Sequence, residues 1–157
     1  MPDQTGDLNP SLSSKTLPGP AHLRHYPAHD LVAWRPEGFL EDELLDAIGR
    51  WLYATERALP SFQRFIDLTR ITNVAVSTSH VFDFAQKRTE KFGGLRPVKS
   101  AVFSEDWVGF GIARMYESLM EGAPIEVRAF RDRAKAAEWL GVPEEVLKLQ
   151  DTPAPSR

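Results

Sequence analysis

Hydrophobic and polar residues follow two periods along this chain: an alternation that predicts strands and a helical recurrence that predicts amphipathic helices. The clearest succession of the two lies between residues 96 and 141. The Val- and Phe-rich run Pro97–Phe103 predicts a strand, and Ile125–Phe130 alternates as a half-buried strand does. A helix follows each strand, and the second helix ends at Gly141, shortly before Pro143. The segments that we expect here are strands 97–103 and 125–130 and helices 104–121 and 132–141.

The first half of the chain shows the same patterns less strongly. Two short apolar runs predict a hairpin, and Glu41 opens a helix in which large apolar residues recur at helical spacing. A strand then precedes a second helix. The segments that we expect are strands 22–26, 31–34 and 62–68, helices 41–57 and 80–92, and a short helical turn near 146–149. This order predicts an α/β fold with a single sheet of four or five mostly parallel strands and about four packed helices.

Composition divides the chain into one domain and two tails. Residues 1–20 hold four of the twelve prolines and few large apolar groups, and residues 151–157 are similar. We therefore expect flexible tails at 1–20 and 151–157, and a single domain over 21–150.

Charge and cysteine content narrow the classes of function. Cysteine is absent, which excludes disulfides, zinc–thiolate sites and a cysteine nucleophile. The net charge of -3 argues against nucleic acid as a partner. No apolar run is long enough to span a membrane, and the N-terminus lacks the pattern of a signal peptide. We expect a cytoplasmic protein.

The helix after Phe103 carries more apolar surface than one sheet requires. Trp107, Phe110 and Arg114 lie beside its main apolar stripe, at helical spacing. The residues of the expected stripe are Val108, Ile112, Met115 and Leu119. Trp107, Phe110 and Arg114 form a candidate surface for binding a protein partner or a second copy of this chain. The alternative is that the two aromatic rings pack under the strand ends or against the N-terminal hairpin.

Three segments resemble one bacterial family. Arg128–Asp132, Ala136–Gly141 and Gly111–Glu117 look like the corresponding parts of the SpoIIAA-like domains of STAS/SEC14 type. The resemblance covers about residues 31–142 and is most specific over the last third of the chain. It implies one sheet of four or five strands with helices packed against it. Many proteins of this family have no assigned biochemical activity.

A second, more distant resemblance is to the anti-sigma factor antagonists that share this fold. Their signature is Asp-Leu-Ser followed, after a spacer, by Asp-Ser-Ser-Gly at a helix N-terminus. Asp67–Thr69 matches the first part, but Ala75 and Val76 stand where that pattern has Asp-Ser. Phosphate or another anion could still bind at Ser77, Thr78 and Ser79, since a helix N-terminus stabilises negative charge. The alternative role of these three residues is N-capping, which we favour.

No constellation in the sequence predicts catalysis. His80 lies near Ser77, Ser79 and Asp83, but these are neighbours at one helix start and lack the convergent placement of a triad. His22, His25 and His29 lack a further ligand nearby, so we expect no metal. Nothing resembles a phosphate loop or a dinucleotide fingerprint, and we expect no cofactor.

Two functions remain compatible with the sequence. The first is a non-enzymatic regulatory or protein-interaction module. The second is a carrier or sensor of a small apolar, lipid-like ligand held between sheet and helices, an idea that the SEC14-type resemblance suggests. Its expected lining residues are Phe82, Phe92, Phe103 and Met115. A large apolar cavity favours the carrier, and a tight core with an exposed aromatic patch favours the module.

Overall fold

The structure is a computed structural model that describes residues 12–17, 22–59, 61–94 and 96–148. Most strands and helices fall where the hydrophobic pattern predicts them. The strands are β1 (Lys15–Leu17), β2 (His22–Tyr26), β3 (Leu31–Arg35), β4 (Gly38–Glu41), β5 (Gln63–Asp67), β6 (Ile71–Ala75), β7 (Val98–Phe103) and β8 (Ile125–Phe130). The helices are α1 (Asp42–Ala58), α2 (Thr78–Glu90), α3 (Trp107–Leu119), α4 (Arg133–Leu140) and α5 (Glu144–Leu147), with one 3-10 turn at Pro27–His29.

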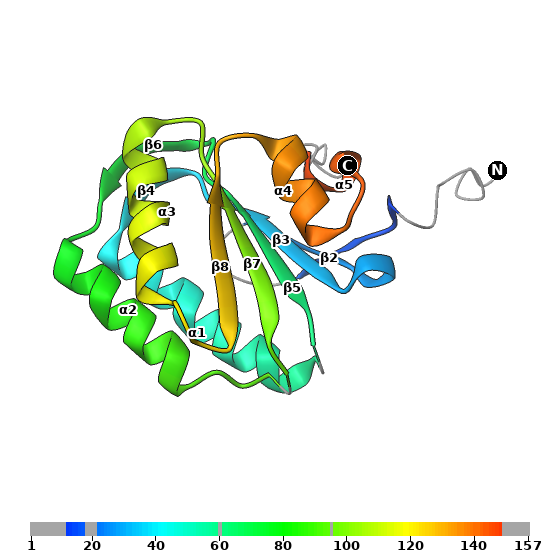
Figure 1. Ribbon diagram of the computed structural model, residues 1–157, viewed down its shortest axis with the longest axis horizontal. Coiled ribbons are helices and arrows are strands. Elements are labelled where there is room, and N and C mark those ends of the chain that lie inside the picture. The colour runs from blue at the N-terminus through cyan, green and yellow to red at the C-terminus, as the bar shows by residue number, and fades with distance from the viewer. Residues whose placement is uncertain (1–11, 18–21, 60, 95, 149–157) are drawn as a thin grey trace, which may run out of the picture.

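The main sheet has the strand order β1-β2-β3-β5-β7-β8. Its first three strands pair antiparallel, and β3, β5, β7 and β8 pair parallel. In Figure 1, α4 and α5 cover one face of this sheet, while α1, α2 and α3 lie on the other. Successive residues of a strand point to opposite faces, so Phe65 packs towards α4 and Ile66 packs towards the other helices. The predicted α/β fold, with its opening hairpin and parallel core, is confirmed.

The number of strands differs from the prediction of a single sheet with four or five. The main sheet has six strands, and β4 and β6 form a separate parallel pair. The sequence carries little sign of this pair, because β4 begins at Gly38, which has a φ of +82°, and both strands are short. β1 adds a further strand inside the predicted tail 1–20, so the tail prediction is wrong for Lys15–Leu17. Residues 1–11, 18–20 and 151–157 of the predicted tails lie outside the described residues.

The helix caps follow the sequence closely. The carboxylate of Asp132 accepts a hydrogen bond from the backbone N–H of Ala134 at 2.9 Å, and Gly141 ends α4 in the left-handed conformation with a φ of +74°. Asp106 accepts from the N–H of Gly109 at 3.0 Å and so begins α3. These contacts fix where α3 and α4 start, at the edge of the sheet where the parallel strands end.

The buried face of α3 differs from the predicted stripe at Val108, whereas Ile112, Met115 and Leu119 are half-buried. Val108 is 59% exposed, whereas Gly109, Ala113 and Met120 are buried. The reason is close approach: a β-carbon added to Gly109 would lie 2.5 Å from the hydroxyl oxygen of Ser104. Gly109 therefore lets the start of α3 approach the sheet closely, and Trp107 and Val108 beside it are turned towards solvent.

Candidate functional site

The start of α3 carries an exposed aromatic cluster that we call the Trp107 face, made of Trp107, Phe110, Arg114 and Arg131. Trp107 is 69% exposed, and its ring meets that of Phe110 edge-on with centroids 6.2 Å apart. The guanidinium carbon of Arg114 lies 6.0 Å from the Phe110 ring centroid. The structure thus brings together the three residues predicted as a partner-binding surface. Their role as such is a prediction that the geometry leaves open.

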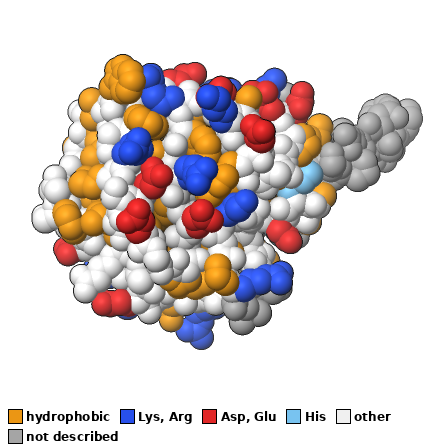
Figure 2. Space-filling model, viewed as in Figure 1, with side chains coloured by type: hydrophobic (Ala, Val, Ile, Leu, Met, Phe, Trp, Pro, Cys, Tyr) orange, Lys and Arg blue, Asp and Glu red, His pale blue; other side chains and the backbone are white. Residues whose placement is uncertain are grey.

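Arg131 completes this cluster, and the sequence pattern did not predict it. Its guanidinium carbon lies 3.6 Å from the centroid of the Trp107 ring, and its Nη2 donates to the backbone carbonyl of Glu105 at 2.6 Å. Arg131 follows β8 directly, and α3 begins shortly after β7. Because parallel neighbouring strands end at the same edge of a sheet, this register places the two segments together. Figure 2 shows hydrophobic side chains exposed among Lys and Arg side chains over α3, at the left of the view.

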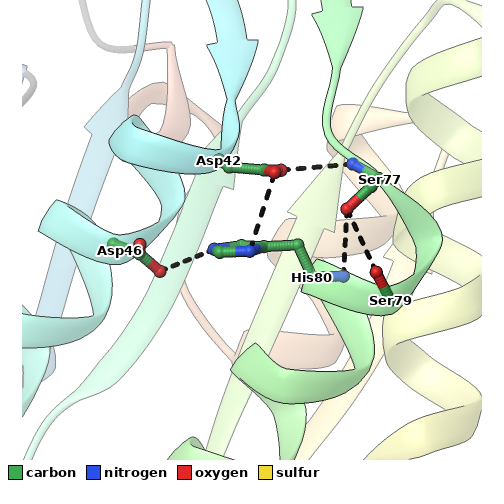
Figure 3. A network of polar contacts seen from close by, with 5 residues as sticks. All are labelled: Asp42, Asp46, Ser77, Ser79 and His80. Carbon is green, nitrogen blue, oxygen red and sulfur yellow. Dashed lines mark hydrogen bonds and ion pairs between the residues drawn. The ribbon is translucent and has the colours of Figure 1, made fainter.

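The start of α2 holds a second polar network, drawn in Figure 3. Ser77 caps the helix, since its hydroxyl oxygen accepts from the backbone N–H of His80 at 3.2 Å, and it lies 3.4 Å from the hydroxyl of Ser79. The carboxylate of Asp42 accepts from the backbone N–H of Ser77 at 3.1 Å. The His80 ring lies between two carboxylates, with Nε2 2.7 Å from Asp46 and Nδ1 3.6 Å from Asp42.

This network joins two helices and is not arranged for nucleophilic catalysis. The hydrogen bond to Asp46, aided by the charges of Asp42 and Asp83, raises the pKa of His80 above its usual value. Each ring nitrogen of His80 faces a carboxylate, whereas the Ser77 hydroxyl contacts the backbone N–H of His80 and the Ser79 hydroxyl. Asp83 is a neighbour of His80 in the sequence, but the carboxylate that is hydrogen-bonded to the His80 ring belongs to Asp46 of α1.

The carboxylate of Asp42 also lies beside the predicted phosphate or anion site at Ser77, Thr78 and Ser79. All three residues are exposed, as such a site requires. However, Asp42 already accepts from the Ser77 N–H, which is one of the donors that an anion would use. N-capping by Ser77 is the role that the geometry shows, and an added phosphate would meet the negative charge of Asp42.

A cavity of about 90 Å³ lies between the main sheet and the helices α1, α2 and α3. Its wall is almost entirely apolar, apart from a few polar side chains. The described lining residues are Trp34, Pro36, Leu40, Leu45, Ile48, Leu52, Arg64, Ile66, Leu68, Val76, Val81, Phe84, Arg88, Ser100, Val102, Ile112, Ala113, Tyr116 and Ile125. These do not include the four residues predicted to line a ligand cavity. Phe82 is 51% exposed, and Phe103 packs on the opposite face, towards α4.

A buried ionic cluster borders this cavity. Glu56 is 4% exposed, and its Oε2 accepts from Nη2 of Arg64 at 2.7 Å and from Nη2 of Arg88. Its Oε1 accepts from the backbone N–H of Gly93 at 3.0 Å. Charged residues are normally expected at the surface, but Glu56 is buried on α1 together with Ile48 and Leu52. Glu56 lies one turn beyond the buried Leu52, so its spacing was a usable signal.

Burial changes the acidity of two groups beside this cluster. It lowers the pKa of Arg64 to about 10, against the opposing effect of Glu56, so that the guanidinium stays charged at neutral pH. Burial also raises the pKa of Tyr116 to about 12, which keeps its phenol neutral. The cluster therefore holds two cations and one anion.

Comparison with known proteins shows a similarity to a solved structure. No family model matches this chain, and no curated protein matches it. Among solved structures, it is similar to an uncharacterized protein of the DUF3478 family from Shewanella loihica PV-4, described as having a SpoIIAA-like fold. The identity is 15%, the similarity covers 82% of this chain and 92% of the other, and the TM-score is 0.45. The fold named there is the one that the sequence resembles, and nothing about activity follows from it.

Within the described ranges, no helix combines the length and apolar character that crossing a bilayer requires. In the same part of the chain, no three His, Asp or Glu side chains gather in a way that could hold a metal ion.

Proposed function

We propose that this protein is a non-enzymatic cytoplasmic module that recognises another protein through the Trp107 face. The observation that carries the proposal is that the Trp107 side chain is 69% exposed and is nevertheless held in a fixed position. Arg131 stacks on its ring and is itself fixed by the carbonyl of Glu105. A large aromatic ring that is both exposed and ordered binds a partner without a large loss of side-chain entropy.

The composition of the face supports the same proposal. Trp and Arg are the residue types most enriched among those that dominate binding energy at protein interfaces. Val108, 59% exposed, extends the apolar area beside Trp107. The partner that we propose is a protein segment with an apolar side chain that packs on Trp107 and with acceptor groups that face Arg114 and Arg131.

Photo-crosslinking tests this proposal. A photoreactive residue replaces Gly111, which is exposed and has open space around its β-carbon position. We expect a crosslinked partner whose yield falls when excess wild-type protein competes, but not when Trp107→Ala protein competes. Phe82→Ala is the matched control, because Phe82 is also a well-exposed aromatic residue, on α2. Competition by both variants to the same extent would refute a role for Trp107.

Sedimentation of the same proteins distinguishes a second copy of this chain from another protein as the partner. If the partner is a second copy, wild-type protein forms dimers that dissociate on dilution, and Trp107→Ala protein remains monomeric. If the partner is a different protein, both sediment as monomers and the crosslink contains another chain.

The cavity favours a second candidate function, binding of a small ligand between the sheet and the helices. A cavity of about 90 Å³ with an almost wholly apolar wall has room for a few water-sized groups. Its size supports a ligand smaller than a lipid. Native mass spectrometry of freshly purified protein, followed by denaturation, tests whether a small molecule accompanies the chain; protein of unliganded mass throughout would count against this candidate.

A further inference from the structure

A groove of about 420 Å³ runs along the surface between α1 and α2. The two helices lie side by side (Figure 1) and approach closely beneath it, since a β-carbon added to Gly49 would lie 3.1 Å from the Phe84 ring. The volume falls within the range of roughly 300–1,000 Å³ that is typical of small-molecule sites. The groove shares no lining residue with the Trp107 face.

Three exposed cations line this groove. Arg50 borders it from α1, and Lys87 and Lys91 border it from the end of α2, one turn apart. Within the described part of the chain, no carboxylate forms an ion pair with any of these three side chains. The whole chain has a net charge of -3, so this positive stretch is a local feature. Cations that gather in a hollow attract a small anion to it.

The other end of the groove is acidic. Asp46 pairs with His80 near the start of both helices, as Figure 3 shows. Further along, Glu56 pairs with Arg88, so the two helices run in the same direction. Asp46 and Asp83 therefore border the end of the groove that precedes the three cations. His80 engages Asp46, and Asp83 remains exposed as an acceptor. An extended polyanion would meet these carboxylates, so the charge pattern favours a compact ligand.

We propose that this groove binds a small phosphate monoester that carries hydroxyl groups, such as a sugar phosphate. Arg50, Lys87 and Lys91 hold the phosphate, and Asp83 accepts a hydrogen bond from a hydroxyl group. A phosphate monoester carries about -1.5 to -2 charges at neutral pH, which matches three cations better than a single carboxylate does. The guanidinium of Arg50 suits phosphate oxygens in geometry, and the two lysines add point charges. This site is independent of the Trp107 face.

Tyr53 gives the groove an ordered aromatic wall. Its ring is 36% exposed and lines the groove. Nη1 of Arg57 donates to the Tyr53 hydroxyl at 3.3 Å, and the guanidinium carbon lies 5.7 Å from the ring centroid. The C–H groups of a sugar can pack on such a ring, whereas inorganic phosphate gains nothing from it. We therefore expect the ester to bind more tightly than the free ion.

Nitrogen–proton NMR titrations of the full chain test the proposal. The probes are ribose phosphorylated at its primary hydroxyl, called ribose phosphate here, with inorganic phosphate, ribose and a phosphoserine peptide, all at constant ionic strength. We expect ribose phosphate to shift the amide signals of α1 and α2 beside the groove and to saturate. Inorganic phosphate should shift the same signals with about tenfold lower affinity, because it lacks the sugar contacts. Ribose should leave them unchanged.

Two double variants with the same change in net charge locate the site. Lys87→Gln with Lys91→Gln should weaken binding of ribose phosphate at least about tenfold, because two phosphate contacts are lost. Lys135→Gln with Lys148→Gln is the matched control, since both residues are exposed and lie outside the groove. It should change the affinity less than about twofold. Arg50→Gln is a second test if the first variant does not fold.

Asp83→Ala tests the hydroxyl contact separately. It removes an acceptor for the sugar and a repulsion for any phosphate, so the preference for ribose phosphate over inorganic phosphate should narrow. An unchanged preference would overturn the role of Asp83.

The remaining outcomes overturn the proposal in distinct ways. Equal affinity for ribose phosphate and inorganic phosphate would leave an adventitious ion only. Tighter binding of the phosphoserine peptide would identify a protein ligand in place of a small molecule. Equal losses in the two double variants would show attraction by the charge of the whole chain. Absence of binding by every probe would remove the site altogether.

Discussion

Replacement of Glu56 by Gln should destabilise the fold more than any other single conservative change on α1. The Glu56 side chain is 1% exposed, and its two oxygens accept hydrogen bonds from Arg64, Arg88 and the backbone of Gly93. Gln keeps the shape and one acceptor oxygen but removes the negative charge. Two buried guanidinium groups would then face each other without a counter-ion.

The magnitude follows from the burial of the cluster. Breaking a buried ion pair by removing one partner lowers the free energy of unfolding by about 3–5 kcal/mol. This is a large part of the roughly 5–15 kcal/mol that stabilises a typical domain. For a chain of this length, each kcal/mol lowers the unfolding temperature by about 2–4 °C, so the expected decrease is roughly 6–20 °C.

Denaturant unfolding and calorimetry of Glu56→Gln measure this loss. Glu43→Gln is the matched control, since Glu43 is exposed on the same helix and should change the free energy by less than about 0.5 kcal/mol. The triple variant Glu56→Met, Arg64→Met, Arg88→Met should recover much of the loss, because it leaves no buried charge in the cluster. A loss below about 1 kcal/mol for Glu56→Gln would refute the reasoning.

Two further predictions concern α3 and α2. Gly109→Ala should destabilise the protein by about 1–3 kcal/mol, because the new methyl group meets the Ser104 hydroxyl. Gly111→Ala on the same helix should stabilise it by about 0.5–1 kcal/mol, because its β-carbon position is open. Denaturant unfolding of both variants measures the two changes, and equal effects would contradict the close approach of Gly109 to Ser104. The raised pKa of His80 means that its bond to Asp46 stabilises the fold fully below about pH 6.5 and less as pH rises through the folded-state pKa. The unfolding temperature of His80→Gln should therefore lie furthest below the wild type in mild acid, and a gap that widens with rising pH would contradict this sign.

Sequence patterns predicted the main elements because most of them are encoded locally. Asp132 and Gly141 fix the ends of α4 through contacts within a few residues, and alternation in β5 and β8 is visible from the chain alone. β4 and β6 were missed because their pairing joins Gly38–Glu41 to Ile71–Ala75, segments that are distant in sequence. Such pairing leaves no local signal in strands this short.

The candidate sites, too, could be predicted where their residues are close in sequence and were missed where they are distant. Trp107, Phe110 and Arg114 lie within two turns of one helix, so helical spacing was enough to group them, whereas Arg131 comes from another segment. The buried cluster was missed because charged residues are normally expected at the surface. The alternation in β5 did indicate burial of Arg64. Arg64 lies on the same side of the strand as the buried Phe62, which faces the helices α1, α2 and α3.

The position of β8 at the end of the main sheet has a consequence for solubility. Within the described part of the sheet it pairs with β7 alone, so its outer edge presents backbone N–H and C=O groups to which a strand of another molecule could add. Glu126 and Arg128 are exposed along this strand, between the buried Ile125 and Val127. Charged side chains on an edge strand oppose such addition, because an incoming strand would have to desolvate them. Glu126 and Arg128 thus protect the folded protein from aggregation, although as exposed residues they add little to the free energy of folding.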